Sequence, residues 1–342
     1  MIGGSTSYLW LVPLACTIAS CDLIPFKLAG DDPCLLTRSF PVDDLEPEER
    51  WQNVAEPSTV RQYHAVVSAR GMVYAVGGYQ SLVRESSAFE AYDPHTDSWT
   101  LLPQMPSPRH FLAAAATDSQ VFAIGGIGNE SAGDSLDLHP TVEVFNIDSG
   151  DWSRVADLPT PRNRFAAVAF DGLVYAIGGL YANGNTGVVE VYNPATDIWE
   201  TRRPMPTPRH GHAATVIGGQ ILVVGGYSNT EDPTSVVEIF DPAKDRWMSV
   251  DRMPTPRGFL GLAAAKGYAY AIAGRGGSPF NALERFDPCL GTWRTLGTIP
   301  GDFRNRFGAA TTDGVIWVVG GEYQGQSRVD LDMLRYDPDN SR

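Results

Sequence analysis

Residues 208–247 read PRHGHAATVIGGQILVVGGYSNTEDPTSVVEIFDPAKDRW, and this stretch contains the elements that recur along the chain. It opens with a Pro-Arg-His triplet, runs through an apolar segment to Gly225-Gly226, and ends with an aromatic residue, Asp-Pro and a tryptophan. The tryptophan returns at nearly constant spacing, at Trp51, Trp99, Trp152, Trp199, Trp247 and Trp293. A fixed period of this length marks one supersecondary unit that is repeated.

Three further series run in register with the tryptophans. Arginines stand at Arg61, Arg109, Arg162, Arg209, Arg257 and Arg304. A pair of small residues follows each arginine at a fixed distance, at Gly77-Gly78, Gly125-Gly126, Gly178-Gly179, Gly225-Gly226, Ala273-Gly274 and Gly320-Gly321. An aromatic residue closes each unit, at Tyr92, Phe145, Tyr192, Phe240, Phe286 and Tyr336. Series that keep register to the end of the chain indicate six copies of one unit.

The segments between these residues have the composition of short strands and tight turns. Residues 173–177 and 221–224 are β-branched and aromatic runs that end at Gly-Gly, which is typical of buried strands. Glycine there permits a positive φ and a close approach of neighbouring backbone. Asp93-Pro94 followed by polar residues has the chemistry of a turn. The pattern predicts an all-β fold.

The Pro-Arg-His triplets, the glycine doublets, the Tyr-Asp-Pro triplets at 92–94 and 336–338 and the tryptophans together resemble the kelch family over residues 51–338. This resemblance implies a six-bladed β-propeller of four-stranded antiparallel blades, to which we assign residues 49–342. The sixth unit has no tryptophan after its closing aromatic residue, Tyr336, whereas Trp51 precedes the first arginine. We therefore expect the N-terminal strand around Trp51 to be the outer strand of the sixth blade and to close the ring.

Charge and motif content limit the classes of function. The formal net charge is −14 and no cluster of Lys and Arg interrupts it, so we expect no nucleic-acid partner. No Gly-x-Ser-x-Gly elbow, phosphate-binding loop or His-Glu-x-x-His motif occurs. His210 and His212 have the spacing of a metal-ligand pair but lack a third ligand. We expect a monomer that has neither a metal nor a cofactor.

The N-terminus has the features of an export signal. Residues 8–19 are mostly apolar and too short to span a bilayer. Ile18-Ala19-Ser20-Cys21 resembles a bacterial lipobox, which predicts a signal peptide at 1–20 and lipidation of Cys21. The polar, acidic segment 21–48 then serves as a linker. Residues 1–7 lack Lys and Arg, so plain cleavage and secretion, or an uncleaved N-terminus in a cytosolic protein, remain alternatives.

The cysteines predict one disulfide in an exported protein. The chain has four cysteines; Cys16 would leave with the signal peptide and Cys21 would carry lipid. The two that remain, Cys34 and Cys289, are expected to pair. The alternative is a pair of separate thiols in a reducing cytosol.

The repeated residues themselves are expected to be structural, with the six motif arginines bonding carbonyls and tying blades together. The resemblance to kelch proteins implies that a ligand contacts two positions in each repeat. These are the residue after the glycine doublet and the residue two positions after the motif arginine. Arg164 and Arg306 also resemble the pocket arginines of kelch adaptors that bind acidic peptides, although each could instead pair with a neighbouring carboxylate. The residues predicted to contact a ligand are Tyr63, Tyr79, Phe111, Arg164, Tyr227, Arg275, Arg306 and Glu322.

These residues favour a binding module over an enzyme. Arginines among aromatic residues suit a protein, peptide or carbohydrate ligand through bidentate bonding and stacking. We predict a membrane-anchored lipoprotein, periplasmic or on the cell surface, or a secreted protein, that has no catalytic residues. The alternative is a cofactorless sugar epimerase or mutarotase of the sialic-acid type, with Arg164, Arg306 and Glu322 in the site and Glu322 transferring the proton.

Overall fold

The computed structural model describes residues 50–80, 84–128, 138–182, 184–229, 232–301, 304–323, 328–329 and 332–339. The signal peptide predicted at 1–20, the linker at 21–48, Cys21 and Cys34 therefore lie outside the described residues. Within the described part, no helix has the length and apolar character needed to cross a membrane.

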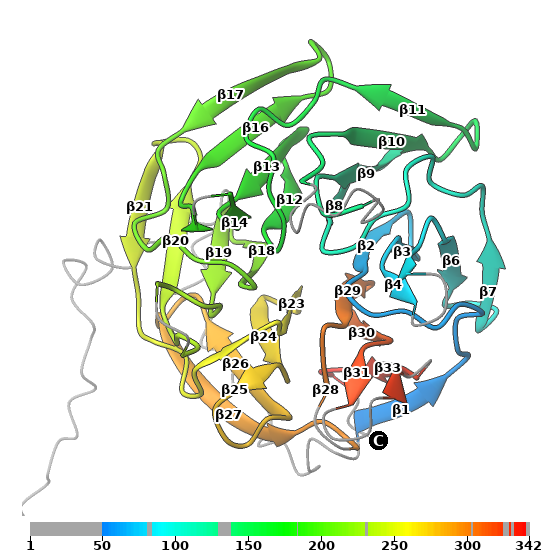
Figure 1. The fold of residues 1–342 in the computed structure, drawn as a ribbon. Helices are drawn as coiled ribbons and strands as arrows, with labels where there is room; N and C mark the ends of the chain where they lie inside the picture. Colours follow the sequence, from blue (N-terminus) through cyan, green and yellow to red (C-terminus); the bar gives the residue numbers. More distant parts are fainter. Residues whose placement is uncertain are drawn as a thin grey trace, which may run out of the picture.

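Six four-stranded antiparallel sheets surround a central axis, as Figure 1 shows. From the axis outward, the first blade contains β2 (Ala65–Ala69), β3 (Met72–Val76), β6 (Phe89–Asp93) and β7 (Ser98–Leu101). The second contains β8 (Ala113–Ala116), β9 (Gln120–Ile124), β10 (Val142–Asn146) and β11 (Trp152–Val155). The third contains β12 (Ala166–Phe170), β13 (Leu173–Ile177), β16 (Val189–Asn193) and β17 (Ile198–Arg202).

The fourth blade contains β18 (Ala213–Ile217), β19 (Gln220–Val224), β20 (Val237–Asp241) and β21 (Arg246–Ser249). The fifth contains β23 (Gly261–Ala265), β24 (Tyr268–Ile272), β26 (Ala282–Asp287) and β27 (Thr292–Thr298). The sixth contains β29 (Gly308–Thr312), β30 (Val315–Val319), β33 (Met333–Tyr336) and β1 (Trp51–Val54). The all-β, six-bladed fold expected from the repeats is confirmed.

Short strands pair in the loops at one end of the propeller. They are β4 (Tyr79–Gln80) with β5 (Arg84–Glu85), β14 (Leu180–Tyr181) with β15 (Gly184–Asn185), β22 (Arg257–Gly258) with β25 (Arg275–Gly276), and β31 (Glu322–Tyr323) with both β28 (Arg304–Asn305) and β32 (Arg328–Val329).

The N-terminal strand closes the ring, as the unpaired Trp51 predicted. β1 pairs antiparallel with β33, with Trp51 opposite Tyr336, and in Figure 1 the first strand in blue lies beside the last in red. The two aromatic rings contact each other with centroids 4.8 Å apart. Since the outer strand of the last blade comes from the other end of the chain, the sixth blade holds both ends of the propeller together.

The glycine doublets allow neighbouring blades to approach closely. Gly225 has φ +64, and a Cβ there would lie 2.4 Å from the carbonyl oxygen of Arg257 in the next blade. The adjacent Gly226 N–H donates to that same carbonyl at 3.0 Å. A side chain at Gly225 would therefore meet main chain that cannot move aside.

The motif arginines are buried and structural, but they act within a blade. Arg209 donates to the carbonyls of Thr207 and Val223 at 3.1 and 3.3 Å and pairs with Glu238 on β20. The expectation that these side chains tie blades together is wrong, because these partners of Arg209 lie in the fourth blade or in the segment that leads into it. Main-chain groups and indoles are among the groups that link neighbouring blades. Nε1 of Trp247, on β21 of the fourth blade, donates for example to the carbonyl of Arg203, which directly follows β17 of the third blade, at 2.9 Å.

The acidic partners of these arginines were not foreseen. Five of them are glutamates two residues before the closing aromatic residue, a regular position that the sequence does display. Burying a guanidinium requires a paired and hydrogen-bonded counter-ion, which this position supplies. The pairs are Arg61–Glu90, Arg109–Glu143, Arg162–Glu190, Arg209–Glu238 and Arg257–Glu284, while Arg304 pairs with Asp332.

Candidate functional site

Six residues, each two positions after a motif arginine, form a closed circle of main-chain hydrogen bonds around the axis. The N–H of each donates to the carbonyl of its counterpart in the preceding blade. The circle closes where the N–H of Tyr63 donates to the carbonyl of Arg306 at 3.0 Å. We call these residues the axial ring; they are Tyr63, Phe111, Arg164, Gly211, Phe259 and Arg306.

The axial ring has a left-handed backbone throughout. Its φ angles lie between 50° and 61°, a region that costs most residues about 1–2 kcal/mol. The closed set of hydrogen bonds compensates this cost, because each N–H and carbonyl finds a partner in the neighbouring blade. The sequence therefore tolerates large side chains at five positions where glycine would be the relaxed choice.

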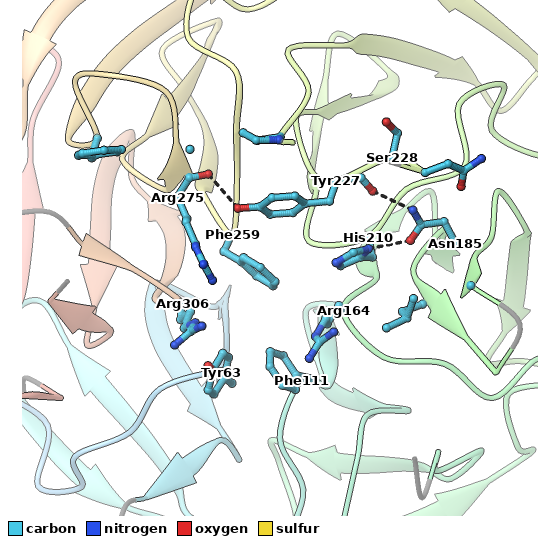
Figure 2. Close-up of a pocket in the computed structure, with 16 residues that line it drawn as sticks. Tyr63, Phe111, Arg164, Asn185, His210, Tyr227, Ser228, Phe259, Arg275 and Arg306 are labelled. Carbon is cyan, nitrogen blue, oxygen red and sulfur yellow. Dashed lines mark hydrogen bonds between the residues drawn. The ribbon is translucent and has the colours of Figure 1, made fainter. Parts of the chain in front are cut away.

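The side chains of the axial ring, at all its positions except Gly211, line a cavity of about 810 Å³ at the end of the propeller that carries the short loop strands. We call this cavity the mouth; Figure 2 shows it in close-up. Six of the eight residues predicted to contact a ligand line it: Tyr63, Phe111, Arg164, Tyr227, Arg275 and Arg306. The two positions per repeat therefore converge on one surface. Whether a ligand binds there stays a prediction.

The other two predicted residues lie outside this lining. Tyr79 packs edge-on against His110, with ring centroids 5.4 Å apart. Glu322 forms an ion pair with Arg306. The mouth is offset from the axis toward the third, fourth and fifth blades, which leaves Tyr79 of the first blade at its periphery.

The two ring arginines differ in their partners. Arg306 pairs with Glu322 and also lies over the ring of Tyr63, with its guanidinium carbon 4.6 Å from the ring centroid. Arg164 lies over Phe111 in the same way, at 4.2 Å. Among the described residues, Arg164 has no carboxylate partner. The alternative of an internal ion pair thus holds for Arg306, whereas within the described ranges Arg164 forms none.

Burial changes the electrostatics of Arg164. Partial burial lowers the pKa of its guanidinium from the usual value, and the nearby charge of Arg306 lowers it further. A group of this basicity remains charged at neutral pH all the same. An incompletely solvated cation gains more from an incoming anion than an exposed one does.

Aromatic side chains form one wall of the mouth. Tyr227 lies between His210 and Phe259, with ring centroids 5.5 Å from each. Its hydroxyl donates to the carbonyl of Arg275 at 3.2 Å. This hydrogen bond joins the ring of Tyr227, in a loop of the fourth blade, to a loop of the fifth blade.

His210 and Asn185 contribute to the mouth, although no pattern in the sequence indicates that they pair. Nδ1 of His210 lies 2.7 Å from Oδ1 of Asn185 on β15, and both residues line the cavity. Burial first, and the charge of Arg164 second, lower the pKa of His210 to about 4. The imidazole is therefore neutral at physiological pH.

His210 and His212 do not form a metal site. His212 is buried, and its Nε2 lies 3.0 Å from the carbonyl oxygen of Ile177. Within the part of the chain that the structure describes, no three His, Cys, Asp or Glu side chains gather as metal ligands would. The other imidazole, that of His210, belongs to the mouth.

Comparison with known proteins agrees with this architecture. The profile of the KLHDC2/KLHL20/DRC7 Kelch-repeats domain matches residues 40–226, and that of the Kelch motif matches residues 208–254 and 256–300. This chain belongs to the kelch-repeat family.

Individual relatives match it over shorter segments. Kelch-like ECH-associated protein 1B of Danio rerio is 36% identical over 109 residues, which cover 32% of this chain and 18% of the relative. Kelch-like protein 35 of Mus musculus is 29% identical over 130 residues, 38% of this chain and 22% of the relative. The kelch-repeat chain thus matches less than a third of the length of these relatives.

A solved structure shares the whole propeller. The chain described as "Structure of YjhT" superposes with a TM-score of 0.73 at 16% identity, over 84% of this chain and 98% of that one. A likeness at this identity speaks for the fold alone.

Proposed function

We propose that this kelch propeller is an exported binding module whose mouth holds a carboxylate-bearing segment of a protein or peptide, with Arg164 as the main cation. The observation that carries the proposal is the guanidinium of Arg164, which is stacked on Phe111 inside an 810 Å³ cavity and has no carboxylate partner among the residues that the structure describes. A partly buried charge without a counter-ion is costly in the free protein. Binding of an anion removes that cost.

The composition of the mouth supports the same class of ligand. Its lining contains three arginines, and among the described residues it contains no Asp or Glu, although the chain as a whole carries a net charge of −14. The printed name of one relative, Kelch-like ECH-associated protein 1B, states association with another protein. A positively charged mouth on an acidic molecule favours ligands that present their charge locally.

Alanine substitution of Arg164 tests this function. We would measure binding of fluorescent peptides by the purified full chain, comparing peptides that contain Asp and Glu with versions that contain Asn and Gln. Arg164→Ala should weaken binding of the acidic peptides by about ten-fold or more, equivalent to about 1.4 kcal/mol. The matched control is Arg154→Ala, since Arg154 lies exposed on β11 in an ion pair with Asp157.

Two results would contradict the proposal. One is equal binding of acidic and neutral peptides, and the other is an Arg164→Ala variant that binds as the parent does. We do not propose the sugar epimerase: its proton-transfer group, Glu322, is engaged by Arg306, and no observation favours catalysis.

Export is proposed on the sequence of the N-terminus alone. The apolar run at residues 8–19 and the lipobox-like Ile18-Ala19-Ser20-Cys21 support a lipid anchor on Cys21. Intact-mass analysis of the chain purified from its membrane fraction should show a diacylglyceryl adduct that Cys21→Ser removes. A full-length, unprocessed mass would contradict export.

The disulfide between Cys34 and Cys289 stays a prediction. Cys289 lies partly buried in the turn before β27, and Cys34 lies outside the described residues. Peptide mapping without a reductant tests the bond; two alkylated thiols would contradict it.

A further inference from the structure

The side chain of Asn185 fixes the orientation of its own amide. Asn185 lies on β15 of the third blade, and its Nδ2 donates to the main-chain carbonyl of Tyr227 in the fourth at 3.1 Å. An amide nitrogen can only donate and a carbonyl can only accept. The other end of the amide, Oδ1, is therefore the end that faces His210, at 2.7 Å from Nδ1.

This orientation determines the tautomer of His210. Since Oδ1 of Asn185 is an acceptor, Nδ1 of His210 must carry the hydrogen. The imidazole is neutral because burial and Arg164 lower its pKa to about 4. A neutral imidazole has a single hydrogen, so Nε2 carries a lone pair and is a hydrogen-bond acceptor.

The ring of His210 is also held in place. It stacks on Tyr227 with an interplanar angle of 22° and lies edge-on to Phe259 at a centroid distance of 6.2 Å. The main chains of His210 and Tyr227 exchange hydrogen bonds of 3.0 and 2.8 Å. In Figure 2 the second ring nitrogen of His210 points into the mouth, toward the space between Phe259 and Arg164.

A donor and an acceptor thus face the same space. Gly211, the residue after His210, donates its N–H to the carbonyl of Arg164 at 2.8 Å. This hydrogen bond makes Gly211 and Arg164 neighbours on the axial ring and so places His210 close to Arg164. A guanidinium offers only N–H donors, whereas Nε2 of His210 offers only a lone pair. A bare carboxylate would satisfy the guanidinium but would be repelled by that lone pair.

We propose that His210, held by Asn185 as an acceptor, selects ligands in which a hydrogen-bond donor, a hydroxyl or an amide N–H, lies next to the carboxylate that Arg164 binds. This inference rests on the proposed function of the mouth. The carboxylate pairs with the guanidinium, and the adjacent donor gives its hydrogen to Nε2 of His210. A ligand without that donor leaves the lone pair of His210 desolvated and unpaired, which costs affinity.

Small probes that differ in one donor test the selection. Titrations of the full chain would compare glycolate with methoxyacetate and N-acetylglycine with N-acetylsarcosine, following ¹⁵N signals of the histidine and arginine side chains. The member of each pair that carries the donor should bind about five-fold more tightly, as expected for one hydrogen bond of about 1 kcal/mol. The pair of probes with the larger ratio of affinities shows whether the site prefers a hydroxyl or an amide N–H as the donor.

Two variants assign the effect to His210. His210→Phe keeps an aromatic ring against Tyr227 and removes the acceptor, so both affinity ratios should fall to about one. Asn185→Leu keeps the imidazole but releases its tautomer, so the ratios should fall and the ¹⁵N spectrum should show hydrogen on Nε2. This second variant keeps the test valid if the first does not fold.

The outcomes separate the two proposals. Equal affinities within both pairs, together with loss of binding in Arg164→Ala, would overturn the role of His210 and leave the proposed function intact. Absence of binding for all four probes, or binding unaffected by Arg164→Ala, counts against both. A ¹⁵N spectrum of the unliganded parent that places the hydrogen of His210 on Nε2 overturns the inference whatever the probes do.

Discussion

Acidification should destabilise the propeller through its buried histidines, and His212 allows the effect to be isolated. His212 is 7% exposed, and burial first, with the charge of Arg209 second, lowers its pKa to about 3. The unfolded chain has the ordinary histidine pKa of about 6.5. Because the folded value is the lower one, the contribution of His212 is complete above pH 6.5 and is lost as the pH falls toward 3.

The size of the loss follows from the two pKa values. At pH 5 an unfolded histidine has bound its proton and the folded His212 has not. The free energy of unfolding therefore falls by about 1.4 kcal/mol for each pH unit below 6.5, which amounts to about 2 kcal/mol at pH 5. His64 is buried to a similar degree, and its pKa is also lowered to about 3. The two residues together should therefore remove about 4 kcal/mol between pH 7 and pH 5.

The chain itself supplies the test variant. Leu112 and Leu260 stand at the position of His212 in the second and fifth blades and are 6% and 7% exposed, so His212→Leu should fit. Urea unfolding of the full chain would be followed by tryptophan fluorescence at pH 7 and pH 5. The variant should lie within about 1 kcal/mol of the parent at pH 7, since it loses one hydrogen bond to Ile177.

Between pH 7 and pH 5 the free energy of unfolding of His212→Leu should fall by about 2 kcal/mol less than that of the parent. His95→Leu is the matched control, because His95 lies exposed in a turn and its replacement should preserve the pH dependence of the parent. If the parent and His212→Leu lose the same free energy between the two pH values, the reasoning is refuted.

Two further predictions concern the scaffold. Gly225→Ala should destabilise the protein by more than about 2 kcal/mol, because strain at positive φ is joined by a clash with main chain. Gly219→Ala, at φ +74 with open space around it, should cost only about 1 kcal/mol; equal losses in thermal melts would contradict the close approach. Deletion of residues 46–58 removes β1, the outer strand of the sixth blade, and should unfold the ring cooperatively, whereas deletion of residues 1–40 should not; equal melting temperatures of the two truncated chains would contradict closure by β1.

The fold could be predicted from the sequence because each repeated residue performs a local task that depends on its own chemistry. A glycine at positive φ and a buried arginine recur in every unit, and in five of the six units the indole donates a hydrogen bond to a carbonyl of the neighbouring blade, so their period gives the number of blades. The unpaired Trp51 even indicated the closure. The buried glutamates were missed although they are periodic, because a charged residue two positions before an aromatic residue also suits an exposed strand face.

The site was less predictable because it depends on contacts that have no period. Position in the repeat brought six residues into the mouth. It could not tell that Glu322 would pair with Arg306, while no carboxylate of the described part of the chain pairs with Arg164. Tyr79 and Tyr227 occupy the same place in their repeats, yet only Tyr227 lines the cavity. The pairing of Asn185 with His210 joins loops of two blades, which only the folded chain places together.

In the axial ring, the main chain holds the structure of the mouth together, while the side chains determine what the mouth can bind. Its six hydrogen bonds run entirely through main chain, so exchanging one ring side chain for another leaves the circle intact, provided that the residue accepts a left-handed backbone. Tyrosine, phenylalanine, arginine and glycine already do so here. The six positions can thus be randomised together as a combinatorial library, in which new specificities are selected at the mouth while the blades beneath it stay as they are.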